Sequence, residues 1–323
     1  MQNNNKKPFY NKTEKSKDFS AKKPFFVKKT EGEAKFPKKP FFTKSKFGEK
    51  AGAKPKFDKD AKSFRPRPKF VPNKPSDTSW GRVSSWYDEM LKDDDSYQQK
   101  VIEPNLLRVV DAKKGEKILD LGSGQGHFSR LFAKAGAEVV GLEISEELIA
   151  LAKKYDTKNV YYIAGKADEA LNFKKEEFDK VTVVLALQNM KNMVKVVEEV
   201  ARVLKPQGKF FLVLNHPAFR VPQETDWGFD EKRKEQFRKV FSYMTPKEVP
   251  IIMDPGKTGK EKTFSYHRPL QDYFKAFAKN GLAVTRLEEW ISHKTSAEGP
   301  KKIAEDSARK EIPIFMLLEV KKV

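Results

Sequence analysis

The sequence KILDLGSGQGHF, residues 117–128, decides the fold that this chain is expected to adopt. An apolar segment typical of a β-strand ends at Asp120-Leu121 and turns through glycines at positions 122, 124 and 126. It then enters a helical pattern near His127. Glycine lets the backbone turn sharply and lets a ligand approach where a Cβ atom would collide. The stretch therefore predicts a ligand-binding turn between a strand and a helix.

A second strand-like segment follows about twenty residues later. Residues 138–143 read EVVGLE, an apolar run that ends in Glu143. An acid at the end of a second strand is placed to accept hydrogen bonds from the two hydroxyl groups of a ribose. The pair of segments thus favours a ligand that contains a nucleoside.

The spacing of the glycines separates the candidate nucleotide ligands. A nicotinamide-binding loop has its third glycine three residues after the second, as G-x-G-x-x-G, whereas here the interval is two residues. The phosphate-binding pattern G-x-x-x-x-G-K-[ST] does not occur in the sequence. A carboxylate beside the loop gives a pyrophosphate site no advantage, but it can hold an α-ammonium group. Asp120 therefore favours a methyl donor with a methionine end over a dinucleotide.

These segments resemble the class I S-adenosylmethionine-dependent methyltransferases, whose first motif is an acid followed by G-x-G-x-G. The resemblance implies an α/β fold of the Rossmann-like kind, a three-layer sandwich around a seven-stranded, mostly parallel sheet. The last strand of that sheet runs antiparallel, and a helical cap and an insertion complete the fold. The resemblance also implies S-adenosyl-L-methionine as the cofactor.

Individual cofactor contacts follow from the same resemblance. Asp120 and the loop at 122–124 would contact the methionine portion, Glu143 the ribose, and Ala167 with Asp168 the adenine. For Asp168 a helix-capping role is an alternative, because Asp after a strand is a common N-cap. The residues expected to bind the cofactor are Asp120, Gly122, Ser123, Gly124, Gly126, Glu143, Ile144, Ala167, Asp168, Gln188 and Asn189.

Two histidines are the candidate catalytic residues. His216 directly follows the fifth expected strand, and His267 lies just before a helix. The segments NHP (215–217) and YHRPL (266–270) resemble parts of small-molecule methyltransferases of ubiquinone and menaquinone biosynthesis. A structural hydrogen bond is the alternative for each histidine.

Absent motifs narrow the class of acceptor. The Asn/Asp-Pro-Pro-aromatic signature of exocyclic amino methyltransferases is missing after the fourth strand. The chain has no cysteine, which excludes a thiolate nucleophile, disulfides and zinc–thiolate sites, and we expect no metal site. The expected acceptor is therefore a small molecule, methylated by in-line displacement.

Strand and helix patterns alternate from residue 117 onward, as in a parallel sheet with crossover helices. A cap is expected at 80–111, and residues 216–266 form an insertion with a helix at about 231–241. The expected helices are 126–135, 146–155, 193–204 and 270–279. The expected strands are 117–121, 138–142, 160–164, 178–187, 209–215, 283–290 and 311–320.

The first quarter of the chain differs from the rest in composition. Residues 1–75 carry 23 of the 65 Lys and Arg but 7 of the 45 Asp and Glu, and they contain no Leu or Ile. Such a segment lacks core-forming residues, so residues 1–78 are predicted to be a disordered Lys/Pro/Phe-rich tail, and residues 79–323 the methyltransferase domain. Lys-Pro-Phe recurs at residues 7–9, 23–25 and 39–41.

The tail leaves alternative functions open. Lysines interleaved with aromatic rings suit a weak contact with RNA or the ribosome through residues 1–75, although a solubilising tail explains them equally well. The alternatives are therefore an RNA- or ribosome-associated methyltransferase, and a non-catalytic nucleic-acid-binding protein on the same fold. We expect no signal peptide or membrane span, and hence a cytoplasmic protein.

Overall fold

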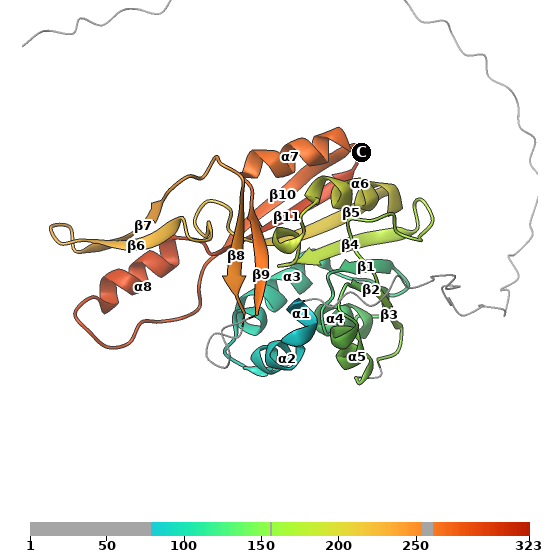
Figure 1. Ribbon diagram of the computed structural model, residues 1–323, viewed down its shortest axis with the longest axis horizontal. Helices are drawn as coiled ribbons and strands as arrows, with labels where there is room; N and C mark the ends of the chain where they lie inside the picture. Colours follow the sequence, from blue (N-terminus) through green and yellow to red (C-terminus); the bar gives the residue numbers. More distant parts are fainter. Residues whose placement is uncertain (1–78, 156, 254–260) are drawn as a thin grey trace, which may run out of the picture. The chain divides into compact units, whose positions relative to one another are not determined.

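The computed structural model describes residues 79–155, 157–253 and 261–323, and the predicted tail lies outside them. The described residues form a seven-stranded sheet with helices on both faces (Figure 1). All strands are parallel except β11, which runs antiparallel to both of its neighbours and confirms the predicted fold. In spatial order the strands are β10 (Leu282–Trp290), β11 (Phe315–Lys322), β5 (Leu204–Asn215), β4 (Phe178–Val184), β1 (Lys117–Leu121), β2 (Glu138–Glu143) and β3 (Val160–Ala164).

The core forms on both faces of the central strands. Successive side chains of a strand point to opposite faces, so Phe210 and Phe211 of β5 enter different layers. Phe211 belongs to the cluster that includes Ile102 and Phe132, whereas the ring of Phe210 meets that of Phe277 at 6.0 Å. One face is thus covered by α3 (Glu103–Val110) and α4 (His127–Lys134), and the other by α6 (Met193–Val203) and α7 (Leu270–Lys279) (Figure 1).

Helix α5 (Glu146–Lys153) begins where the sequence predicts. The Ser145 side chain accepts a hydrogen bond from the Leu148 amide at 3.1 Å, as an N-cap residue does. Glu146 and Glu147 lie in the first turn, where negative charge is favourable. This cap fixes the start of α5 directly beside the end of β2.

The insertion between β5 and α7 contains two β-hairpins. The predicted helix at 231–241 is wrong, because these residues form the turn and second strand of the first hairpin. Cross-strand contacts override the helical propensity of its charged residues: Phe237 pairs with Gly228, and the Arg238 guanidinium lies 4.9 Å from the Trp227 ring centre. The hairpins are β6 (Thr225–Asp230) with β7 (Glu235–Val240), and β8 (Lys247–Ile252) with β9 (Lys262–His267).

Three boundaries near the sheet differ from the predictions. Strand β4 ends at Val184, and a 3₁₀ turn, η2 (Leu187–Asn189), follows where a longer strand was expected. Strand β5 begins at Leu204, earlier than the expected start at 209, and its pairing with β4 contains an irregularity. An unpredicted helix, α8 (Lys302–Glu311), precedes the last strand and packs against β7, and the strand itself begins at Phe315, later than the expected start at 311.

The cap consists of short helices that precede β1. These are α1 (Ser79–Arg82), α2 (Ser84–Lys92) and the π-helical turn η1 (Gln98–Ile102), which continues into α3. Helix α1 contacts both α5 and β9, and the Arg82 side chain bonds Glu261 at 2.6 Å. The first cap helix therefore connects the sheet domain to the second hairpin of the insertion.

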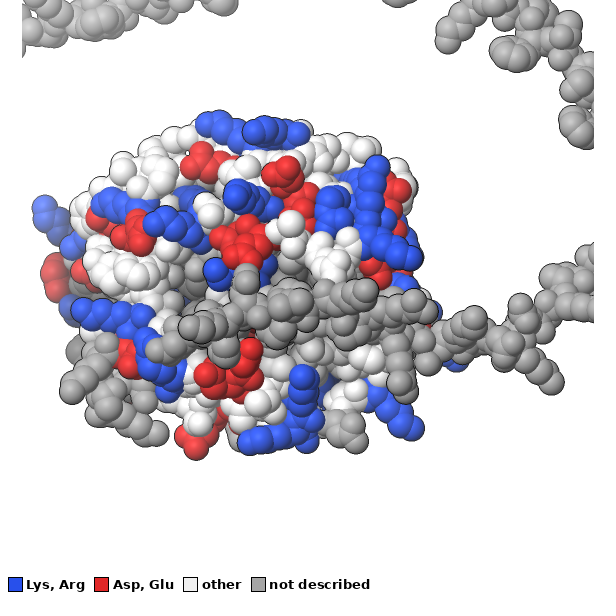
Figure 2. Space-filling view, turned by 45° about the vertical axis from the view of Figure 1, so that its right-hand side comes forward, with Lys and Arg blue, Asp and Glu red and all other residues white. Residues whose placement is uncertain are grey.

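The described surface carries mixed charge. Figure 2 shows basic and acidic side chains interspersed on the face in view, with neither sign gathered into one continuous patch. None of the described helices has the length and apolar content required to cross a lipid bilayer. Within the described residues no group of three His, Asp or Glu side chains is arranged to hold a metal ion.

An ion pair connects α3 to β10 of the sheet. Glu288 of β10 accepts hydrogen bonds from Arg108 of α3 at 2.5 and 3.2 Å, and a further one from the Trp290 indole at 3.1 Å. The bond from Arg108 contributes most to lowering the pKa of Glu288 from 4.5 to about 2. Because the folded pKa is depressed, this contribution to stability is present above pH 4.5 and is lost as the pH falls toward 2.

We predict that Glu288→Gln lowers the free energy of unfolding at pH 7 by about 1–2 kcal/mol, a value discounted for the exposure of Arg108. Urea unfolding at pH 7, 5 and 3.5 checks this: the gap between variant and wild type should be nearly the same at pH 7 and 5 and smaller at pH 3.5. Glu235→Gln is the control, because Glu235 pairs with Arg233 between exposed side chains. A gap that stays constant with pH would contradict the assignment.

Candidate functional site

Backbone hydrogen bonds and glycine conformations hold the glycine loop in place. The amides of Gly122 and Ser123 both donate to the Leu142 carbonyl, at 2.7 and 3.1 Å, which fastens the loop to β2. Gly122, Gly124 and Gly126 all have positive φ, the region that glycine adopts at no steric cost. A Cβ atom on Gly122 would lie 2.6 Å from the Cβ of Ala186. The loop therefore needs its glycines for conformation as well as for space.

Glu143, at the end of β2, joins the loop to the start of α5. One carboxylate oxygen accepts from the Gly124 amide at 3.0 Å, and the other accepts from the Ser145 amide at 3.1 Å. The residue is 6% exposed, and burial raises the pKa of its carboxyl group despite these bonds. A carboxylate has about four acceptor positions, so both oxygens can still accept hydrogen bonds from a ligand.

Asp120, the acid before the first glycine, is buried under the loop. It accepts hydrogen bonds from the hydroxyls of Ser129 at 2.6 Å and Thr182 at 2.9 Å. Burial raises the pKa of Asp120, and the two hydroxyls act in the opposite direction. Asp120 and Ser123 line a narrow recess beside Tyr87, which shares Tyr87, Gly122 and Val184 with the wall of a larger cavity. The buried Ser123 hydroxyl and Gln125 side-chain oxygen have no hydrogen-bond partner among the described residues.

Tyr87 of α2 lies over this recess. Its ring is near enough to the loop that a Cβ on Gly124 would approach it to 3.5 Å, and it meets the Trp80 ring edge-on at 5.6 Å. Burial, followed by the charges of Glu143 and Asp120, raises the pKa of Tyr87 to about 12. Tyr87 lies in the described walls of the cavities, whereas two other aromatic residues of the cap, Trp86 and Tyr97, do not.

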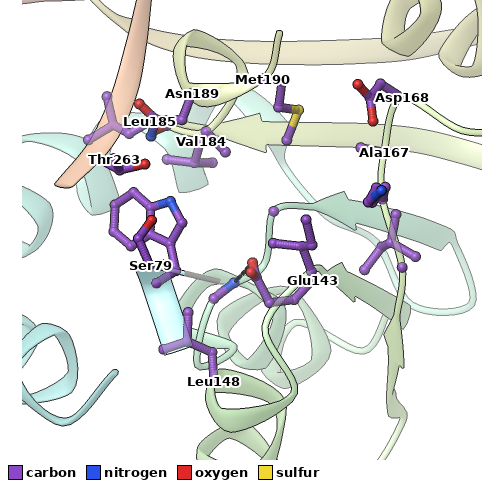
Figure 3. A pocket seen from close by; sticks show the side chains of 18 of the residues that line it. Ser79, Glu143, Leu148, Ala167, Asp168, Val184, Leu185, Asn189, Met190 and Thr263 are labelled. Atoms are coloured by element: carbon purple, nitrogen blue, oxygen red, sulfur yellow. Dashed lines mark hydrogen bonds between the residues drawn. The ribbon is translucent and has the colours of Figure 1, made fainter. Parts of the chain in front are cut away.

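A cavity of about 450 Å³ opens beside the glycine loop (Figure 3). Glu143 lies at its floor, with Ala167 and Asp168 on one side and Ser79 and Thr263 on the other. The walls come from the carboxyl ends of β1 to β4, from α1 and from β9. Of the predicted cofactor residues, those that line this cavity are Gly122, Gly124, Glu143, Ile144, Ala167, Asp168 and Asn189.

A second cavity of about 420 Å³ adjoins the first. The two share lining residues from α1, α2 and the end of β4, namely Trp80, Tyr87, Leu185 and Asn189. Residues of the insertion supply most of the rest of the second cavity's wall, among them Arg220 and Arg238. Gln188, predicted as a cofactor residue, lines this second cavity, and Gly126 lies against the Tyr162 hydroxyl instead.

The end of β4 is strained where the cavities meet. Leu185 has φ +52°, which is unfavourable for a residue with a branched side chain. Its carbonyl accepts from the amide group of Gln188 at 3.0 Å, which leaves the buried Gln188 oxygen without a partner among the described residues. Strain of this kind persists where the surroundings over-determine a functional geometry.

The predicted catalytic histidines lie outside the described linings of both cavities. Nδ1 of His216 accepts from the amides of Ala218 and Phe219, so Nε2 carries the proton and donates to Glu289 at 2.7 Å. Burial lowers the pKa of His216, which favours this neutral form. Nε2 of His267 contacts the Tyr243 carbonyl at 2.7 Å. Neither position reaches a described cavity wall, so a catalytic role for either histidine stays a prediction.

Sequence reasoning missed the residues that come from the cap and the insertion. Ser79 and Trp80 belong to a four-residue helix, too short to produce a periodic pattern. Thr263 and Tyr266 belong to β9, a strand in an insertion that was predicted to be helical. Arg220 and Arg238 sit in a segment with many charges and no motif. No local signal in the sequence distinguishes these residues from their neighbours.

Comparison with known proteins identifies the central part of the chain. A family described as "Methyltransferase domain" matches residues 119–212. A demethylmenaquinone methyltransferase of Bacillus cereus (strain ATCC 10987 / NRS 248) is 33% identical over 172 residues, covering 51% of this chain and 68% of that protein. The match therefore extends well beyond the glycine loop.

Two further similarities are weaker. An uncharacterized methyltransferase of Bacillus subtilis (strain 168), YcgJ, is 30% identical over 129 residues, or 39% of this chain and 51% of that protein. The chain thus spans about half the length of the first curated relatives that it matches. The crystal structure of an S-adenosylmethionine-dependent methyltransferase from Mesorhizobium loti has a TM-score of 0.56 and 24% identity, covering 71% of this chain and 99% of that one. This likeness concerns the fold.

We predict that Gly122→Ala lowers the free energy of unfolding by about 2–4 kcal/mol, because it combines a positive φ with a collision against Ala186. Gly115→Ala is the matched control: its φ is +82°, but the space around its Cβ is open, so about 1 kcal/mol is expected. Denaturant unfolding of both variants measures the difference. Equal losses would show that the close approach to Ala186 carries no cost.

Proposed function

The chain belongs to the class I S-adenosylmethionine-dependent methyltransferases, and from this premise we propose that residues 79–323 transfer a methyl group from S-adenosylmethionine to a small-molecule acceptor. The observation that carries the proposal is Glu143. It is a buried carboxylate bonded to the Gly124 amide, and it forms the floor of a cavity bordered by the glycine loop. The volume of about 450 Å³ falls within the range typical of cofactor pockets.

The recess beside Tyr87 suits the methionine end of the donor. The unpartnered hydroxyl of Ser123 and the unpartnered oxygen of Gln125 offer hydrogen bonds to a polar group there. Asp120 adds a negative charge, which favours an α-ammonium group and whose two hydroxyl partners hold the carboxylate in one orientation. These groups are buried, so a charge-assisted bond to them is stronger than it would be in water.

The larger cavity suits the nucleoside. Glu143 has acceptor positions left for two ribose hydroxyls, and its oxygens are already fixed by backbone amides. Ala167 and Asp168 border the end of the cavity that an adenine would occupy, with Asp168 as a hydrogen-bond acceptor for an amino group. When bound, S-adenosylmethionine supplies a methyl group on a positively charged sulfur.

The second cavity is the proposed acceptor site, because it meets the first at Tyr87 and Asn189. Holding two reactants in line and away from water is the main requirement for methyl transfer to a good nucleophile. Trp80 and Tyr87 lie between the cavities and exclude water from this junction. Tyr87, with its pKa near 12, stays protonated at neutral pH and can donate a hydrogen bond. In the transfer the carbon–sulfur bond breaks, a bond from the acceptor to the methyl carbon forms, and S-adenosylhomocysteine leaves.

We predict that the full-length protein binds S-adenosylmethionine and that Glu143→Gln weakens this binding at least tenfold, because a buried, fixed acceptor is lost. Isothermal titration calorimetry measures the affinity. Glu146→Gln is the control, since Glu146 lies three residues away and is exposed. Absence of binding by the wild-type protein, or unchanged affinity in Glu143→Gln, would refute the assignment.

Turnover tests the acceptor class separately. With donor labelled in its methyl group, label is expected in a pool of small metabolites and not in RNA. Transfer into RNA alone would overturn the small-molecule assignment while leaving the donor site intact.

A pH dependence of donor binding follows from the raised pKa values of Glu143 and Asp120. Both groups must be ionised to hold the donor, so affinity should fall as the pH is lowered through pKa values that lie above those of ordinary carboxyl groups. Calorimetry between pH 5 and 8 checks this, and Glu143→Gln should flatten the dependence. A flat profile in the wild-type protein would show that neither carboxylate contacts the ligand.

A further inference from the structure

The second cavity has an unusual electrostatic composition. Its described lining residues include Arg220 and Arg238 but neither Asp nor Glu, and Asp226, whose charge acts on Arg238, lies outside this lining. The donor cavity differs, because Glu143 and Asp168 there face Lys166 and Lys191. Two cations that face one space without a carboxylate are unfavourable unless an anion joins them.

Arg220 is the less satisfied of the two arginines. Within the described part of the chain its guanidinium makes a ring contact with Phe315 at 5.6 Å, and it has neither a hydrogen bond nor an ion pair. Arg220 is exposed where it lines the cavity, yet enough protein surrounds its side chain that desolvation lowers its pKa; Arg238 lowers the pKa further, and Tyr97 acts in the opposite direction. Arg108 and Arg202, by contrast, each bond a carboxylate elsewhere in this domain.

Arg238 is held in position by its own contacts. It donates to the Phe219 carbonyl at 2.9 Å and to the Thr225 hydroxyl at 2.7 Å, and it lies over the Trp227 ring. These bonds occupy part of its guanidinium and link the first hairpin to the segment that carries Arg220. Arg238 therefore contributes a fixed positive charge, whereas Arg220 offers free donors.

We propose that the acceptor carries an oxyanion, a carboxylate or a phosphate, and that Arg220 binds this group through its guanidinium while Arg238 adds to the positive potential. The inference rests on the proposed function, because it names the class of molecule that occupies the acceptor site. A guanidinium presents donors in a planar fork that matches both carboxylate and phosphate oxygens. The positive wall also excludes a cationic acceptor from approaching the positively charged sulfur of the donor.

The site has one further property that fits an anion. Among its described lining residues no histidine, carboxylate or lysine is available as a general base. An acceptor with an acidic group reaches this cavity already ionised at neutral pH, and two arginines favour that ionised form. The same two arginines thus attract the acceptor and favour its ionised form.

The test measures binding of three matched probes to the full-length protein saturated with S-adenosylhomocysteine. Benzoate and phenyl phosphate carry the two candidate oxyanions, and benzamide has the same ring without charge. At least one anion should bind tenfold or more tightly than benzamide, and the tighter of the two identifies the group. Equal binding of all three probes would overturn the proposal.

Variants locate the anion. Arg220→Gln should weaken binding of the preferred anion about tenfold or more, and Arg220→Lys should restore part of it. Arg233→Gln is the control, because Arg233 belongs to the hairpin that carries Arg238 but pairs with exposed Glu235 outside the described lining of the cavity. Unchanged anion affinity in Arg220→Gln would overturn the assignment of that residue.

Two further measurements keep the results separable. The Arg220 side chain makes no hydrogen bond to the described residues, so Arg220→Gln should melt at the wild-type temperature or slightly above it and bind S-adenosylhomocysteine normally. If the wild-type protein binds S-adenosylhomocysteine but discriminates no anion, this inference fails and the proposed function stands. If it binds no S-adenosylhomocysteine, the proposed function fails first.

Discussion

The hydrogen bonds that the Glu143 carboxylate receives from the amides of Gly124 and Ser145 are the interaction on which the rest of the site depends. They connect the turn after β1 to the turn after β2, at the edge where all the parallel strands end. Because these strands are neighbours, the two turns are brought together by the backbone pairing of the sheet. A buried acid placed there is fixed by the scaffold before any ligand arrives, and this pre-organisation reduces the cost of binding.

The donor side of the site could be predicted because its signals are local. The glycine spacing, the acid before it and Glu143 each belong to a strand-to-helix turn whose geometry the chain sets within a few residues. The N-cap of α5 was predictable for the same reason, since Ser145 bonds an amide three residues further on. Asp120, by contrast, was expected to contact the cofactor. In the structure its carboxylate accepts hydrogen bonds from the hydroxyls of Ser129 and Thr182.

The acceptor side could not be predicted because its structure depends on contacts between distant residues. The segment 231–241 has the composition of a helix, but pairing with β6 and the stacking of Arg238 on Trp227 select a hairpin instead. Helix α8 packs against that hairpin from some sixty residues away in sequence, and Lys301 lies 4.3 Å from the Phe229 ring centre. A charge that lacks a partner, such as that of Arg220, is visible only after the chain has folded and its neighbours are known.

The insertion has an evolutionary consequence. Most of the donor cavity is built from residues 122–191, with additions from the cap and β9, whereas the distinctive wall of the proposed acceptor cavity comes from the insertion between β5 and α7. The two cavities are therefore formed largely by consecutive parts of the chain. Substitutions or exchanges within the insertion can change which molecule is methylated while the sheet and its glycine turn stay the same. In this architecture the range of substrates can change while the residues that bind the methyl donor are retained.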